Sequence, residues 1–144
     1  MRDDPAKRSG YLHFTRHSTR WGDNDAYGHL NNVVHYALLD STVNSWLIEQ
    51  GLLDPRSSEI IGLVVETGCR YHSELSYPSP VDAGLRVARI GRSSVRYELG
   101  LFAEQSDTAA AEGFFVHVYV DAKSRRPVAI PGPMRDALSK LLSE

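Results

Sequence analysis

A short polar segment, residues 20–32, holds most of the side chains that could do chemistry in this 144-residue chain. It reads RWGDNDAYGHLNN, with two carboxylates, a histidine, a glycine and paired asparagines. Asp23 and Asp25 are two positions apart, and we expect them not to share a proton as a dyad. We expect one of them to cap or brace the loop while the other faces a site.

The glycine and the helix that follows indicate what such a carboxylate could act on. Gly28 permits a positive φ or the close approach of a ligand, and Asn31 or Asn32 is a good N-cap. The first turn of a helix offers unpaired N–H groups and the positive end of its dipole, which suit a carbonyl oxygen that gains negative charge. An aspartate nearby could attack that carbonyl or deprotonate a water, so the pattern favours acyl transfer or hydrolysis.

Other chemistries fit less well. His29 could be a general base, an orienting group or a structural residue, and the positive helix end disfavours its imidazolium form. A metal site would draw on Asp23, Asp25, His29 and His35, but the two histidines are not spaced to share one helical face. The chain has no Gly-x-Ser-x-Gly elbow and no Walker or Rossmann glycine pattern. Cys69 lies in an apolar strand, where burial is more usual than reactivity.

The elements that must position this segment are a strand before it, a long helix after it and further strands. Residues 11–20 alternate as a strand does. Residues 32–50 contain no Gly or Pro, and Gly51 is a natural helix stop. After about residue 58 we expect about four strands in a meander with antiparallel connections, then a short terminal helix. The predicted fold class is α+β, with one long helix on one face of an antiparallel sheet.

The long helix is unusually polar for one that a sheet must cover. Its apolar stripe is predicted from Val34, Ala37, Leu38 and Trp46, and it is interrupted by Asp40, Ser41, Thr42, Asn44 and Ser45. The pattern fits either a solvated helix face or a face that lines a pocket or a subunit interface.

Composition limits the class of protein. Hydrophobic residues make up 42% and charged residues 24%, as in an ordinary globular domain, so we expect one domain over 1–144 with residues 1–10 loosely held. The net charge of -2 argues against a nucleic-acid or membrane-surface partner. The one cysteine excludes an internal disulfide framework, and no signal core or membrane-spanning run is visible, which predicts a cytoplasmic protein.

The segment WGDNDAYGHLNNVVHYALLD resembles the signature of hotdog-fold acyl-CoA thioesterases of the 4-hydroxybenzoyl-CoA thioesterase type. That pattern is Asp-x-Asp-x-x-Gly-His-x-Asn-Asn, followed by a helix that carries a tyrosine. The matching positions are Asp23, Asp25, Gly28, His29, Asn31, Asn32 and Tyr36. The resemblance covers residues 11–122 and departs at positions 81–84, where VDAG stands instead of the Gly-Asp pair often found after the proline turn.

The resemblance implies a hotdog fold, in which a curved antiparallel sheet wraps one long helix. It implies a homodimer or homotetramer with active sites at the dimer interface, an acyl-CoA substrate, and no cofactor or metal. Asp25 would be the nucleophile or general base, His29 would position substrate or water, and the N–H near Asn32 would polarise the thioester carbonyl. The residues expected to bind or support the substrate in this segment are Asp23, Tyr27, Gly28 and Tyr36.

Basic residues could meet the phosphates of coenzyme A. Two clusters are present: Arg86, Arg89, Arg92 and Arg96 in one, and Lys123, Arg125 and Arg126 in the other. The segment GRSSV opens a strand where members of the family often contact the nucleotide, so Arg92 and Ser93 are the preferred candidates. The alternative for any one of these residues is a solvated basic surface.

Hydrolysis of acyl-CoA to free acid and CoA is the leading hypothesis. The alternatives are a hotdog protein that binds acyl thioesters without turnover, a thioesterase acting on acyl carrier protein, and a hydratase of the same fold. Asp25 favours catalysis, because a pure binder has no need of a carboxylate beside a bound ester. No pattern in the sequence selects a short, long or aryl acyl group.

Overall fold

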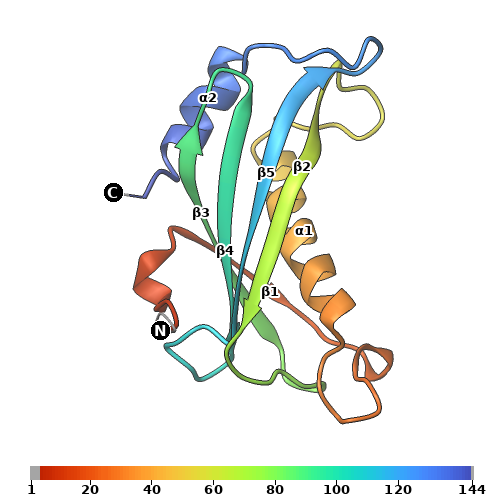
Figure 1. The fold of residues 1–144 in the computed structure, drawn as a ribbon, viewed down its shortest axis with the longest axis vertical. Coiled ribbons are helices and arrows are strands. Elements are labelled where there is room, and N and C mark those ends of the chain that lie inside the picture. The colour runs from red at the N-terminus through yellow and green to blue at the C-terminus, as the bar shows by residue number, and fades with distance from the viewer. Residues whose placement is uncertain (1–3, 144) are drawn as a thin grey trace.

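A five-stranded antiparallel sheet with one long helix on one face forms the centre of the molecule, in a computed structural model that describes residues 4–143 (Figure 1). The strands are β1 (His13–His17), β2 (Ile60–Tyr71), β3 (Val81–Ile90), β4 (Ser94–Ala103) and β5 (Ala111–Asp121). The helices are α1 (Asn32–Glu49) and α2 (Gly132–Ser139), with short 3-10 turns at Arg8–Gly10 and Trp21–Asp23. The predicted α+β class is confirmed.

The strand order in the sheet is β1-β3-β4-β5-β2. Strands β3, β4 and β5 form the expected antiparallel meander. The prediction that β2 also belongs to the meander is wrong, because β2 pairs with β5, with Ile60 opposite Asp121 and Tyr71 opposite Ala111. This pairing joins residues 40 to 61 positions apart, which local periodicity does not encode. It leaves β2 as an edge strand.

Helix α1 begins and ends as the capping signals predict. The Asn31 side chain accepts a hydrogen bond from the Val33 N–H at 3.0 Å, and Gly51 follows the helix with φ 71°. The buried face differs from the predicted apolar stripe, since Ala37 is exposed. The buried residues of α1 are His35, Leu39, Thr42, Val43, Trp46 and Leu47.

Two polar side chains belong to this buried face because each has a partner inside the fold. The His35 ring contacts the Asn31 carbonyl oxygen through Nδ1 at 3.1 Å. The Thr42 hydroxyl donates to the Leu38 carbonyl at 2.7 Å and lies 2.8 Å from His17 Nε2. A prediction that sorts residues by polarity alone therefore misplaces the helix face.

The core lies between α1 and the inward side chains of the sheet. Val95, Tyr97, Leu99 and Leu101 alternate along β4 and are all fully buried. They pack in one cluster with Leu39 and Val43 of the helix and with Met134 and Leu138 of α2.

The opposite face of the sheet, its outer face, is partly covered by residues 4–12. The Tyr11 ring lies over the backbones of Gly84 and Gly100, where an added Cβ would come within 2.8 Å of it. Phe102 is buried beneath the same ring, with the two ring centroids 5.8 Å apart. The N-terminal segment therefore fills this part of the outer face.

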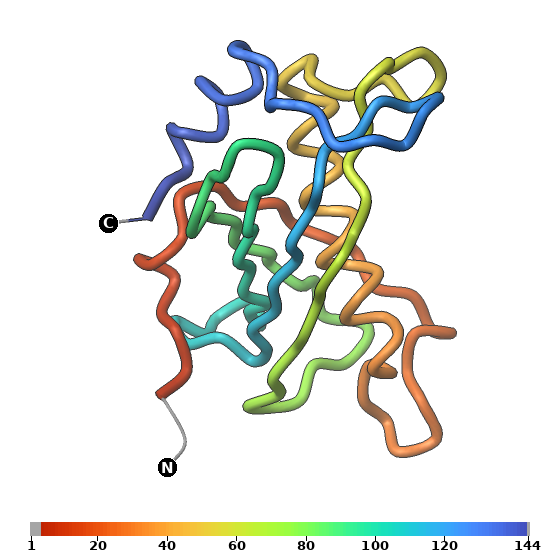
Figure 2. Tube along the Cα trace, turned by 45° about the horizontal axis from the view of Figure 1, so that its top comes forward, coloured from red at the N-terminus to blue at the C-terminus, as the bar shows by residue number. Residues whose placement is uncertain are grey.

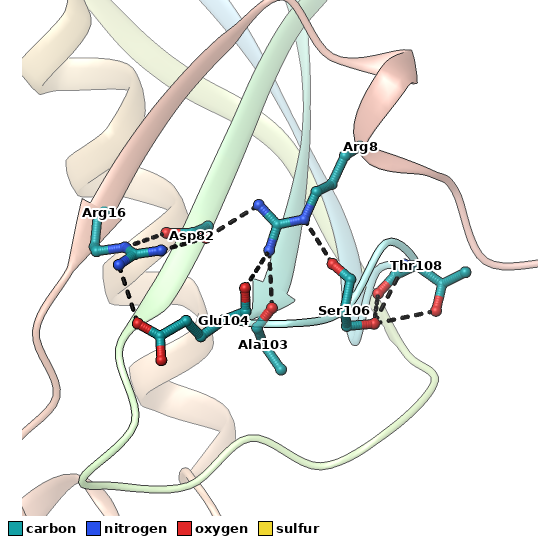
Figure 3. A network of polar contacts seen from close by, with 7 residues as sticks. All are labelled: Arg8, Arg16, Asp82, Ala103, Glu104, Ser106 and Thr108. Carbon is teal, nitrogen blue, oxygen red and sulfur yellow. Dashed lines mark hydrogen bonds and ion pairs between the residues drawn. The ribbon is translucent and has the colours of Figure 1, made fainter.

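A polar network holds the N-terminal segment in place (Figure 3). Arg8 Nη1 lies 3.0 Å from Asp82 Oδ2, and Arg8 Nε donates to the Ser106 carbonyl at 2.6 Å. Arg16 Nε, on β1, pairs with the other oxygen of Asp82 at 2.8 Å. Residues 1–10 are expected to be loosely held, and of these, residues 1–3 lie outside the described residues. Residues 4–10 are anchored by these contacts, which join positions far apart in sequence.

The two ends of the sheet carry different connections. At one end, the connection after α1 and the connection after β5 lie side by side, joined by a hydrogen bond from Ala122 N–H to the Glu59 carbonyl at 2.8 Å (Figure 2). The polar segment 20–31 lies at the other end, where α1 begins (Figure 1). Within the described part of the chain, no helix is long and apolar enough to cross a membrane.

Candidate active site

Asp23 links the two ends of the polar segment through hydrogen bonds. Its side chain is buried and accepts hydrogen bonds from the Arg20 backbone N–H at 2.8 Å and from the Arg20 guanidinium at 3.0 Å. Its carbonyl accepts from the Asn31 N–H at 2.9 Å, which joins the two ends of the loop. Asp23 is therefore the carboxylate that braces the loop.

Asp25 is half-buried at the turn of the loop, and its two carboxylate oxygens differ. Oδ1 accepts from the Tyr27 N–H at 2.8 Å and from the His29 N–H at 3.4 Å. The Asp25 N–H donates to the His29 carbonyl at 2.8 Å. Oδ2 has no hydrogen-bond partner among residues 4–143. One oxygen thus fixes the side chain while the other remains available to a substrate or a water.

Gly28 turns the chain toward the helix with φ 85°, a conformation that residues with a Cβ rarely adopt. Its N–H donates to the Asp25 carbonyl at 3.1 Å, and its carbonyl accepts from the Ser76 hydroxyl at 2.9 Å. Beside it, the Tyr27 side chain is 83% exposed. The turn therefore presents an uncovered aromatic ring next to Asp25.

The first turn of α1 leaves one donor free. The Asn31 side chain accepts a hydrogen bond from the Val33 N–H, and the Asn31 carbonyl accepts one from the Val34 N–H at 2.9 Å. The N–H of Asn32, the first residue of the helix, has no acceptor among the described residues. Such a donor at the positive end of a helix is suited to an oxyanion.

A second segment braces the loop from the connection between β2 and β3. His29 Nε2 lies 2.8 Å from Glu74 Oε2, and the Leu30 N–H donates to the Leu75 carbonyl at 2.7 Å. Asn24 Oδ1 accepts from the Tyr77 N–H at 3.1 Å. Sequence reasoning missed this brace, because nothing local in the segment YHSELSYPSP marks a contact with residues about 50 positions earlier.

The interior histidines near the site are neutral. Burial lowers the pKa of His17 and of His35. Because the Thr42 hydroxyl donates to the Leu38 carbonyl, it accepts from His17, so the proton of this imidazole is on Nε2. Tyr36, on the same helix, is half-buried and packs its ring edge-on to Phe115 at 6.5 Å.

Within one chain, Arg92 and Ser93 lie far from the other predicted site residues. They form the turn between β3 and β4, at the opposite end of the sheet from residues 20–31 (Figure 1). Their backbone carbonyls hold neighbouring segments, accepting from the N–H groups of Ile130 at 2.9 Å and Tyr119 at 2.8 Å. The Arg92 side chain is exposed. The other predicted site residues gather around the loop and the helix start.

A hollow of about 440 Å³ on the outer face does not contain the polar segment. Two of its arginines share one carboxylate, since Arg86 Nε lies 3.0 Å from Glu98 Oε1 and Arg96 Nε lies 3.2 Å from Glu98 Oε2. Because the hollow contains neither Asp25 nor the start of α1, we place the candidate site at the polar segment instead.

Comparisons with known proteins give a family and several similar structures. The profile of the thioesterase-like superfamily matches residues 19–138, which include the polar segment and the whole of the sheet except β1. Among solved structures, the PA5185 protein of Pseudomonas aeruginosa strain PAO1 is 54% identical, covers 99% of each chain and has a TM-score of 0.94. No curated protein matches the chain.

Two further solved structures are similar at lower identity. The PA2801 protein of Pseudomonas aeruginosa, named as a candidate thioesterase, is 27% identical over 89% of this chain and 98% of its own, with a TM-score of 0.83. A 1,4-dihydroxy-2-naphthoyl-CoA thioesterase from Synechocystis is 14% identical over 89% of this chain and 96% of its own, with a TM-score of 0.80. The likeness at 14% identity concerns the fold alone. It confirms the predicted hotdog fold.

Proposed function

The chain belongs to the thioesterase-like superfamily, and from this premise we propose that it hydrolyses acyl-CoA thioesters to the free acid and CoA. One observation carries the proposal. Asp25 Oδ2 and the first N–H of α1 both lack a hydrogen-bond partner among residues 4–143, and the turn at Asp25 leads directly into this helix. A nucleophilic or basic oxygen and an oxyanion donor are the two groups that hydrolysis of an activated ester needs.

Asp25 can act in either of two ways. As a general base it takes a proton from water while the water oxygen bonds to the thioester carbon, and the carbonyl becomes an oxyanion that the Asn32 N–H stabilises. Collapse of this intermediate breaks the carbon–sulfur bond and releases the CoA thiolate. As a nucleophile, Asp25 forms a mixed anhydride and expels the thiolate, and water then cleaves the anhydride.

The remaining residues of the loop are proposed to position the substrate. His29, held by Glu74, orients substrate or water beside Asp25. Gly28 keeps the backbone open to the ligand, and the exposed ring of Tyr27 and the half-buried ring of Tyr36 offer apolar contact on either side of the turn. Asp23 acts indirectly, by fixing the loop.

We propose further that the active protein is a homodimer or homotetramer of the 4-hydroxybenzoyl-CoA thioesterase type, in which β2 pairs with β2 of a second copy. Leu63, Val64 and Val65 are consecutive residues on this edge strand and all are exposed, so apolar side chains are uncovered on both of its faces. An open apolar strand edge favours pairing with another chain.

This pairing would place the site between two subunits. The His35 and Tyr71 rings are 4.9 Å apart, which puts the start of α1 beside the C-terminal end of β2. In an antiparallel pair, that end lies beside the N-terminal end of β2 in the partner subunit. The opposite end of the partner's sheet, with its Arg92 and Ser93 turn, would then approach the CoA bound at this loop.

Thiol release from a panel of short-chain, long-chain and aryl-CoA esters tests the proposal, with Asp25→Asn in parallel. The variant keeps Oδ1 as an acceptor for Tyr27 and His29, so the fold and the subunit association should persist. Loss of the base or nucleophile should lower kcat by about 10²-fold to 10⁴-fold. Turnover in the variant that is close to wild type would contradict the mechanism, and no turnover by the wild type would contradict the function.

A further inference from the structure

A small cavity lies between the C-terminal half of α1, the first residues of β2 and strand β5. Its volume is about 90 Å³. An engineered apolar cavity of about 150 Å³ in another protein holds benzene, so this space fits the last few atoms of a chain and not a whole ligand. Most of the wall is apolar, and its polar exceptions are Asn44, His117 and Tyr119.

His117 is the unusual member of this wall. It is 3% exposed, and among residues 4–143 its two ring nitrogens are the buried side-chain polar atoms that have no hydrogen-bond partner. The hydroxyls of Tyr97 and Tyr119 bond to each other at 2.7 Å, and neither makes a hydrogen bond to the ring nitrogens of His117. Buried polar groups without partners are costly and uncommon, so the site calls for an occupant.

The neighbouring strand keeps the polar edge of the ring open. Gly62 of β2 lines the same cavity, and a Cβ at this position would come within 3.0 Å of His117 Nδ1. Burial lowers the pKa of His117 to about 4, so the ring is neutral near pH 7 and offers one N–H donor and one acceptor nitrogen. Such a ring suits an uncharged oxygen, above all a hydroxyl, which can donate or accept.

The cavity lies far from Asp25 of its own chain. Asn44 follows Asn32 by 12 residues, which is about 18 Å along a helix. The residues of β2 that line the cavity, Ile60 to Gly62, are at the N-terminal end of that strand. In the antiparallel pair of β2 strands proposed above, this end lies beside the start of α1 in the partner subunit.

We propose that this cavity receives the far end of the acyl group bound at the partner subunit's loop, and that His117 hydrogen-bonds a neutral oxygen there. The enzyme would therefore select acyl thioesters whose far end bears a hydroxyl or carbonyl group over their plain hydrocarbon counterparts. This inference rests on the proposed thioesterase function and on the dimer.

The test compares matched acyl-CoA pairs that differ in one hydroxyl: hexanoyl and 6-hydroxyhexanoyl, octanoyl and 8-hydroxyoctanoyl, and benzoyl and 4-hydroxybenzoyl. For the pair whose length matches the cavity, wild-type kcat/KM should favour the hydroxylated ester by about tenfold or more, because an unmet buried partner is costly. In His117→Phe, which keeps a ring of similar size, the ratio of kcat/KM for the hydroxylated ester to that for the plain ester should fall about tenfold. His117→Asn, which restores a donor and an acceptor, should recover part of the preference.

Equal rates or a preference for the plain ester in every pair would overturn the inference while leaving the thioesterase function intact. If the wild type cleaves no ester, the proposed function fails. The inference is then tested separately by calorimetric titration with non-hydrolysable thioethers: 6-hydroxyhexyl-CoA, hexyl-CoA and their eight-carbon equivalents. Tighter binding of a hydroxylated thioether that is lost in His117→Phe supports the site. The same affinity for both members of each pair overturns it.

Discussion

Replacing His117 by phenylalanine should make the protein less sensitive to acid. The ring lies in the core, where it packs against Tyr97 at 5.0 Å and Phe115 at 6.1 Å between centroids. In the described part of the chain, no charged side chain is hydrogen-bonded to it. Burial also raises the pKa of neighbouring Tyr119 to about 12, so that hydroxyl stays neutral. Protonation of His117 in the folded state would therefore place an uncompensated charge in the core.

The size and sign of the effect follow from the pKa of His117, which burial lowers from 6.5 to about 4. Below pH 6.5 the unfolded chain binds a proton at this residue that the folded protein does not bind until about pH 4. The free energy of unfolding therefore falls as the pH drops through this window, and His117 contributes no loss above it. Each pKa unit is about 1.4 kcal/mol, so the loss reaches about 3 kcal/mol near pH 4.

Urea unfolding of the wild type and of His117→Phe at pH 7, 6, 5 and 4 measures this loss. His17 and His35 also have a pKa lowered by burial, but they are present in both proteins and cancel in the difference. Between pH 7 and pH 4 the difference in unfolding free energy should shift by about 3 kcal/mol in favour of the variant. A difference that stays constant with pH would refute the reasoning, because His117 would then titrate alike in both states.

Two further predictions concern the fold and the assembly. Gly84→Val should lower the free energy of unfolding by about 1–3 kcal/mol in urea denaturation, because its Cβ would meet Tyr11 at 2.8 Å. Adding Tyr11→Ala should relieve part of this strain. If the losses of the two single variants simply add in the double variant, the contact is contradicted. Val65→Glu should yield a monomer by light scattering together with a loss of thioesterase activity, because it places like charges at the centre of the proposed β2 pair; a stable dimer of unchanged activity would exclude this edge as the interface.

The sequence predicted the parts of the molecule that depend on neighbouring residues. Asn31 caps the helix, Gly51 follows its end and Gly28 adopts a positive φ, each because local backbone chemistry decides the conformation. The spacing of the two aspartates does not separate their roles, because residues two apart face the same way on an extended chain. The 3-10 turn at Trp21–Asp23 and the turn that begins at Asp25 separate them instead. Their contact with the substrate stays a prediction.

The parts that the sequence did not predict depend on long-range pairing. The place of β2 beside β5 and the contact of Glu74 with His29 each join segments whose approach is decided by the whole fold. The buried His117 had a signal that was overlooked. Phe115, His117 and Tyr119 alternate on the inward face of β5, so the position of His117 between two inward aromatic residues is itself a local signal of burial.

The N-terminal segment over the outer face also limits how dimers could assemble further. Stacked sheets lie about 10 Å apart, which leaves room for one layer of interdigitating side chains from each. Over β3 and β4 that layer is already occupied by Tyr11, which Arg8 and its network hold in register with the sheet. Any tetramer built by stacking two dimers back to back would have to make its contact over the β5 half, where Val116 and Val118 are only half-buried. The segment would act as a spacer that directs the geometry of higher assembly.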